Sequence, residues 1–111
     1  MSDQDFSKLL EEIKRRILSV SSPERIILFG SYARGEQNAN SDVDLLVIEK
    51  NVNAPRQESV RLRRVLRGLM VPIDVLVATP EQIERHRESV GLIYGPAVRE
   101  GRVIYERAAS S

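Results

Sequence analysis

The chain has 111 residues, enough for one hydrophobic core, so we expect a single domain over residues 1–111. Its 17 basic and 16 acidic residues leave a net charge of +1, which argues against a broad nucleic-acid-binding surface or a membrane-attracted one. The absence of cysteine excludes disulfides, a thiol nucleophile and a cysteine-based zinc site. No apolar run has the length of a signal peptide or a membrane helix, so we expect a cytoplasmic protein.

An amphipathic helix and a buried strand open the chain. Apolar residues from Phe6 to Val20 recur at three- and four-residue steps, which predicts a helix over about residues 3–20. This helix is expected to end before Pro23, because proline cannot continue the hydrogen-bond ladder. The apolar run that follows predicts a first strand over about residues 25–29, buried on both faces.

The rest of the chain alternates helical and strand patterns. The expected helices lie at about residues 31–35, 56–69 and 79–90 and in a short segment ending at 101, and the expected strands at about 42–48, 71–77 and 102–106. Thr79 and Pro80 have the residue types that begin a helix, an N-cap followed by a first helical position. His86 is the single histidine and lies among charged residues, so we interpret it as a surface residue rather than a metal ligand.

Two aspartates in the second expected strand form a candidate metal site. Side chains alternate along a strand, so Asp42 and Asp44 project from one face, with Cα atoms about 6.5 to 7 Å apart. Two carboxylates on one face repel each other, and leaving both there is costly unless a cation lies between them. Paired oxygen ligands without a nearby histidine or cysteine favour Mg²⁺ over zinc or copper.

Gly30 and Ser31, at the end of the first expected strand, form a candidate phosphate-binding turn. Glycine lets the backbone approach a ligand, and a serine that opens a helix places a hydroxyl beside free N–H groups. An anion bound there, next to a carboxylate-held Mg²⁺, fits a nucleoside triphosphate. Each motif alone also has an ordinary structural interpretation, as a turn or as a solvated strand edge. An aspartate that interrupts a buried-type run is harder to explain structurally, and Asp74 does this as well.

The combined motif resembles a known family. Gly30-Ser31, ten residues and then Asp42-Val43-Asp44 is similar to the signature of the polymerase-beta-type nucleotidyltransferases. The short length and the segment from Tyr32 to Gly35 resemble the minimal nucleotidyltransferases (MNT), the antitoxins of prokaryotic HEPN/MNT toxin-antitoxin pairs. The resemblance implies a small α/β fold, a mixed sheet flanked by helices, in which Asp74 supplies a third carboxylate on a neighbouring strand.

The resemblance also implies an activity and a partner. The expected reaction transfers AMP from ATP to a hydroxyl, expected to be that of a tyrosine, on a HEPN-domain RNase toxin, which this modification would silence. The residues implied for metal binding and catalysis, with two Mg²⁺ ions, are Asp42, Asp44 and Asp74, and those implied for nucleotide binding are Gly30, Ser31 and Arg34. The chain would assemble with its toxin, and neither membrane contact nor direct nucleic-acid contact is expected.

Several alternatives stay open at this point. Arg34 suits phosphate, the partner protein or a nearby carboxylate equally well. Arg56, Arg64 and Arg67 have the pattern of a solvated helix face, and the alternative is a docking surface for nucleotide, RNA or a partner. The chain could also neutralise a toxin by binding alone, although its intact motif residues argue against an inactive site. A drug- or RNA-modifying enzyme is disfavoured because such relatives carry an extra domain, for which 111 residues leave no room.

Overall fold

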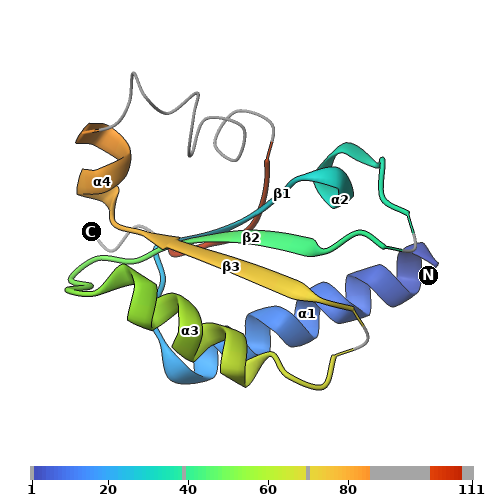
Figure 1. Cartoon of the computed structure of the whole chain (residues 1–111), viewed down its shortest axis with the longest axis horizontal. Coiled ribbons are helices and arrows are strands. Elements are labelled where there is room, and N and C mark those ends of the chain that lie inside the picture. The colour runs from blue at the N-terminus through green and yellow to red at the C-terminus, as the bar shows by residue number, and fades with distance from the viewer. Residues whose placement is uncertain (1, 39, 70, 86–100, 109–111) are drawn as a thin grey trace.

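Four strands form one mixed sheet, and helices α1 and α3 cover one of its faces (Figure 1). The computed structural model describes residues 2–38, 40–69, 71–85 and 101–108. The elements follow in chain order as α1 (Asp3–Val20), β1 (Arg25–Phe29), α2 (Ser31–Arg34), β2 (Val43–Ile48), α3 (Pro55–Val65), β3 (Ile73–Ala78), α4 (Pro80–Arg85) and β4 (Arg102–Glu106). The mixed α/β architecture predicted from the sequence is therefore confirmed.

The sheet has the strand order β3-β2-β1-β4. Strand β1 pairs antiparallel with β2 and with β4, whereas β2 and β3 are parallel and are connected through α3. The register pairs the last residue of β1, Phe29, with Asp44, and pairs Val43 with Ile73. The end of β1 and the starts of β2 and β3 consequently meet at the same end of the sheet.

The main hydrophobic core lies between the sheet and the two helices that cover it. Helix α1 contributes Leu9, Ile13 and Ile17, which form the apolar stripe that its sequence predicts. Burial of a side chain of this size stabilises the fold by about 1.5–3 kcal/mol. The other core residues are Ile26 and Leu28 of β1, Tyr32 of α2, Val43, Leu45 and Val47 of β2, Leu62 and Leu66 in and after α3, and Val75 and Val77 of β3.

The opposite face of the sheet has a smaller apolar cluster. Ile27, Leu46, Ile48 and Ala78 are buried there, and Phe29 and Ile83 pack against them. Strand β1 is thus buried on both faces, as its continuous apolar run predicts. Since side chains alternate along a strand, this second face also receives the side chains at the even-numbered positions near the starts of β2 and β3.

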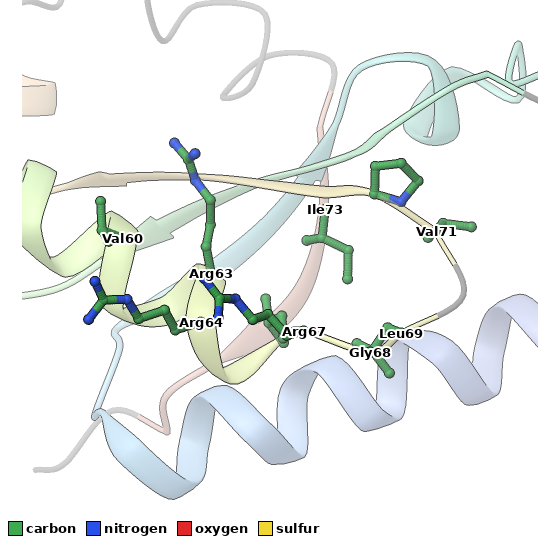
Figure 2. Close-up of a pocket in the computed structure, with 10 residues that line it drawn as sticks. Val60, Arg63, Arg64, Arg67, Gly68, Leu69, Val71 and Ile73 are labelled. Carbon is green, nitrogen blue, oxygen red and sulfur yellow. The ribbon is translucent and has the colours of Figure 1, made fainter.

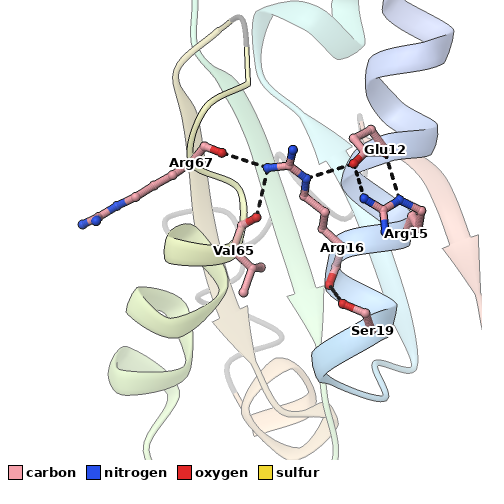
Figure 3. Close-up of polar contacts among 6 residues, drawn as sticks. All are labelled: Glu12, Arg15, Arg16, Ser19, Val65 and Arg67. Atoms are coloured by element: carbon pink, nitrogen blue, oxygen red, sulfur yellow. Dashed lines mark hydrogen bonds and ion pairs between the residues drawn. The ribbon is translucent and has the colours of Figure 1, made fainter.

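Helix α3 ends four residues earlier than the sequence pattern predicts, at Val65 rather than near Leu69. The chain turns at this point and adopts a φ of 85° at Gly68, a conformation that glycine accepts without steric cost. The guanidinium of Arg16 donates hydrogen bonds from Nη1 to the carbonyl oxygens of Val65 (3.2 Å) and Arg67 (2.8 Å), as Figure 3 shows. A side chain from α1 therefore binds carbonyl groups that the end of α3 leaves without helical partners.

Two other boundaries bear on the sequence predictions. Strand β2 begins at Val43, so Asp42 directly precedes the strand instead of lying within it. Helix α4 begins as predicted: Thr79 Oγ1 accepts a hydrogen bond from the N–H of Gln82, whose side chain accepts one from the N–H of Thr79. The predictions for His86 and for helices over residues 86–100 lie outside the described residues. None of the helices in the described part of the chain is long and apolar enough to cross a membrane.

Glu49, just after β2, is a buried carboxylic acid. Its side chain is only 4% exposed, and within the described residues Oε2 has no hydrogen-bond partner. Burial, and then the neighbouring carboxyl of Glu58, raises the pKa of Glu49 from 4.5 to about 7. The folded chain therefore keeps a proton that the unfolded chain releases between these two pH values, and stability is lost as the pH rises through this window.

We expect Glu49→Gln to remove this pH dependence. At about pH 8 the variant should be more stable than the parent chain, by as much as about 3 kcal/mol, because the amide carries no charge to desolvate. Denaturant unfolding between about pH 5 and pH 8 measures the effect. Glu81→Gln, at an exposed position of α4, is the matched control and should leave the pH profile unchanged. A parental pH slope in Glu49→Gln would show that another group is responsible.

Candidate active site

Asp44 and Asp74 lie side by side on neighbouring strands. They are direct partners in the parallel register of β2 and β3. Their side chains share the face of the sheet that carries Leu46 and Ile48, opposite the face covered by α1 and α3. Asp44 is half-buried and Asp74 is exposed. The expectation that Asp74 lies next to the Asp42/Asp44 motif on an adjacent strand is therefore met in position.

Gly30 brings the backbone at the end of β1 against Asp44. A methyl group added at its Cα would lie 2.3 Å from Asp44 Oδ2, far inside the sum of the van der Waals radii. The backbone of Gly30 also has φ 74° and ψ −157°, a region that is essentially restricted to glycine. Both observations require glycine at this position, and they connect the two halves of the sequence motif in space.

The remaining motif residues surround this contact. Ser31 opens the one-turn helix α2 and is half-buried, and within the described residues its hydroxyl makes no hydrogen bond. Arg34 closes α2, and its Nε lies 3.1 Å from Glu36 Oε2 in an exposed ion pair. Asp42 is exposed directly before β2. The structure thus gathers all six predicted site residues around the end of β1 and the starts of β2 and β3.

Electrostatics at Asp44 reflect this concentration of carboxylates. Burial raises the pKa of the Asp44 carboxyl above its ordinary value, and the charges of Asp74 and Asp42 raise it further. Arg34 acts in the opposite direction and lowers the same pKa. A bound cation would relieve the repulsion among these oxygens, and an oxygen-only donor set suits Mg²⁺. No group of three His, Cys, Asp or Glu in the described ranges is already arranged as a metal centre, so metal binding stays a prediction.

Arg63 is a neighbour of the site that the sequence analysis did not single out. Its Nη2 lies 3.5 Å from Asp74 Oδ1, and both side chains are exposed. These two residues line a groove of about 700 Å³ that also includes Phe29, Val60 and Leu76. Helical periodicity places Arg63 on the exposed side of α3, but only the packing of α3 beside β3 brings it to the aspartate.

Comparison with known families assigns the chain to one of them. The model of the nucleotidyltransferase domain family matches residues 7–99, which include every residue of the motif. The chain belongs to the nucleotidyltransferase domain family. The sequence-based assignment to the nucleotidyltransferases is thereby confirmed, and the Gly30/Asp44 contact lies in the part of the chain that matches the family.

Two proteins of Methanocaldococcus jannaschii are similar in sequence to this nucleotidyltransferase. MJ0141, described as a candidate protein adenylyltransferase, is 29% identical over 76 residues, which cover 67% of this chain and 76% of that protein. MJ1305, described in the same way, is 54% identical over 73 residues, covering 64% of this chain. The match spans only 48% of MJ1305, about half its length.

Two solved structures share the fold. A candidate nucleotidyltransferase from Sulfolobus solfataricus superposes with a TM-score of 0.64 and 24% identity, covering 90% of this chain and 79% of that one. A toxin-antitoxin structure determined with AMP-PNP superposes with a TM-score of 0.60 and 22% identity, covering 88% and 73% of the respective chains. At this level of identity, the likeness establishes the nucleotidyltransferase fold alone.

Ser31→Ala tests the predicted phosphate contact in this nucleotidyltransferase. We expect the affinity for a non-hydrolysable ATP analogue to fall by about tenfold, the loss typical of one hydrogen bond to a charged group. The unfolding free energy should stay within about 0.5 kcal/mol, because the hydroxyl has no partner among the described residues. Calorimetric titration measures the first quantity and thermal unfolding the second. Ser22→Ala, at an exposed serine before β1, is the control, and an unchanged dissociation constant for Ser31→Ala would contradict the contact.

Proposed function

We propose that this nucleotidyltransferase is a Mg²⁺-dependent protein adenylyltransferase that transfers AMP from ATP to a hydroxyl of a cognate toxin and thereby acts as its antitoxin. The observation that carries the proposal is the direct pairing of Asp44 with Asp74, with the Gly30 backbone held against Asp44. Family membership supplies the reaction class. The two M. jannaschii relatives, which are described as candidate protein adenylyltransferases, support protein as the acceptor.

The toxin is the finer part of the proposal. One structure with this fold is that of a toxin-antitoxin determined with AMP-PNP, and this supports a toxin as the partner and a nucleoside triphosphate as the substrate. The sequence motif resembles that of the MNT antitoxins, whose partners are HEPN-domain RNases. We therefore propose a HEPN-domain toxin as the acceptor protein and a tyrosine as the modified residue.

The chain's own residues have distinct proposed roles. The backbone at Gly30 and the hydroxyl of Ser31 would hold the phosphates, and Arg34 would offset negative charge near Asp44. Asp42, Asp44 and Asp74 would hold Mg²⁺, which when bound lowers the repulsion between carboxylates and phosphates and stabilises the charge on the leaving group. Asp74 is exposed, so an incoming acceptor can reach its carboxylate.

The proposed reaction is an in-line displacement at the α-phosphorus of ATP. The acceptor hydroxyl oxygen forms a bond to the α-phosphorus, and the bond from that phosphorus to the bridging oxygen of pyrophosphate breaks. Asp74 would accept the proton of the hydroxyl, and pyrophosphate leaves with the electron pair of the broken bond. The protein contributes positioning and charge, which suffice for most of the catalysis in phosphate transfer of this kind.

A labelled transfer assay tests the proposal. The protein is incubated with Mg²⁺, ATP labelled at the α-phosphate, and the product of the gene adjacent to its own. Label on that product, absent when ATP is labelled at the γ-phosphate or when EDTA removes the metal, is the expected result, and mass spectrometry should locate the added AMP on a tyrosine. Neutralisation of the toxin without label would show that the chain acts by binding alone.

A further inference from the structure

One side of helix α3 and the turn after it carries a cluster of exposed arginines. Arg56, Arg63, Arg64 and Arg67 surround the exposed side chain of Val60, and we call these five residues the arginine face. Their spacing of three or four positions places them along the same side of the helix. Figure 2 shows Arg63, Arg64 and Arg67 with Val60 around the groove that this face borders.

Most of the charge on this face is not neutralised. Arg63 forms an exposed ion pair with Asp74, whereas in the described part of the chain no carboxylate pairs with Arg56, Arg64 or Arg67. The neighbouring Arg61 differs, because its guanidinium binds both carboxylate oxygens of Glu58 and the carbonyl oxygen of Val20. The net charge of the whole chain is only +1, so the arginine face is a local excess of positive charge. Such a surface is suited to bind anionic groups.

The arginine face also borders apolar surface. Val60 is 46% exposed, and the apolar lining of the adjoining groove of about 440 Å³ includes Leu69, Val71 and Ile73, the first residue of β3. This groove shares Val60 and Arg63 with the larger groove that contains Asp74. A ligand on the arginine face therefore lies along a continuous surface that leads to the proposed catalytic aspartate.

We propose that the arginine face binds an acidic segment of the polypeptide that accepts AMP, and so brings the acceptor hydroxyl to Asp74; this inference rests on the proposed function. Alternating acidic and aliphatic side chains complement guanidinium groups beside an apolar groove. Single-stranded RNA fits less well, because binding of that kind relies on aromatic side chains that stack against bases. Among the described residues, the arginine face and the lining of its groove include no aromatic side chain, and Phe29 lines only the larger groove that contains Asp74.

Binding can be measured separately from catalysis. A short fluorescent peptide that alternates glutamate with leucine around one tyrosine is titrated with the full chain, and anisotropy reports binding. Its glutamine counterpart and a single-stranded RNA serve as comparison probes. Arg64→Glu combined with Arg67→Glu should weaken binding of the acidic peptide by about tenfold or more, since two attractive charges become repulsive. Lys8→Glu combined with Lys50→Glu makes the same change in net charge at exposed positions outside the face, and should change binding less than about twofold.

Each contrary result has a definite meaning. Equal losses in the two double variants, equal affinity for the acidic and glutamine peptides, or no measurable peptide binding would overturn the proposal. Tighter, arginine-dependent binding of the RNA would assign the face to nucleic acid instead. With labelled ATP, the arginine variant should raise the KM for the peptide and leave kcat and the KM for ATP unchanged. If no AMP is transferred to any acceptor, the proposed function fails, whereas the binding comparison still decides whether the face recognises acidic polypeptide.

Discussion

Asp44→Asn is expected to lower the rate of AMP transfer by about 10³-fold or more while the chain stays folded. Asp44 is the half-buried member of the pair with Asp74, and the amide would lose both the negative charge and one oxygen donor for Mg²⁺. The ionised carboxylate is disfavoured in the metal-free fold, because burial and the charges of Asp74 and Asp42 raise its pKa. A neutral side chain removes that penalty, so the midpoint of thermal unfolding should stay the same or rise slightly.

Initial rates of labelled AMP transfer test this expectation. They are measured at saturating ATP over a range of Mg²⁺ concentrations, and Asp42→Asn and Asp74→Asn are measured in the same way. Asp5→Asn, at an exposed position in the first turn of α1, is the matched control and should keep the parental rate. If Asp44→Asn retains transfer within about tenfold of the parent, the assignment of the metal site to this pair is wrong. If Asp74→Asn alone is harmless, Asp74 does not accept the proton.

Gly30→Ala should be damaging both to stability and to activity. The substitution forces alanine into a backbone region that only glycine adopts readily, at a cost of about 1–3 kcal/mol. The added methyl group would also collide with Asp44 Oδ2, at 2.3 Å, so either the carboxylate or the end of β1 must move. We expect AMP transfer to fall by about 10²-fold or more, because displacement of a reacting group by about 1 Å has effects of this size.

Gly35→Ala separates these two causes. Gly35 also has a positive φ, of 72°, but an added methyl group there would meet no atom within 4 Å. This variant should therefore lose about 1–2 kcal/mol of stability from backbone strain and keep most of its activity. Denaturant unfolding and transfer rates are compared for the two variants. Equal losses of activity would show that backbone strain in general, and not the contact with Asp44, explains the effect of Gly30→Ala.

The architecture explains why residues so far apart in the sequence form one site. The connection from β1 to β2 reverses the chain, so that the antiparallel β2 brings Asp44 beside the end of β1. The crossover through α3 then places β3 parallel to β2, with Asp74 opposite Asp44. Helix α3 connects β2 to β3, and its arginines consequently lie close to the site that this connection creates. The position of Asp74, a proposed catalytic carboxylate, and the proposed docking surface thus arise from the same crossover.

Many element bounds and most candidate site residues could be predicted from the sequence, because they depend on local chemistry. The bounds of α1, β1 and β4, the start of α4 at Thr79 and the burial of β1 on both faces follow from side-chain periodicity, proline and helix capping, which act over a few residues. The motif residues at Gly30, Ser31, Asp42 and Asp44 could be selected because their types and spacing suit phosphate and metal, and Asp74 because it interrupts an apolar strand.

Only the tertiary structure decided the relations that depend on strand register and on packing between distant segments. It fixed the register that pairs Asp44 directly with Asp74 and the close approach of Gly30 to Asp44, brought Arg63 to Asp74, and buried Glu49 beside Glu58. It also ended α3 at Val65, where Arg16 from the other helix binds the free carbonyl groups. These contacts join residues of different elements, and no local propensity specifies them. For the strand residues, a shift of one residue in register would turn each side chain to the opposite face.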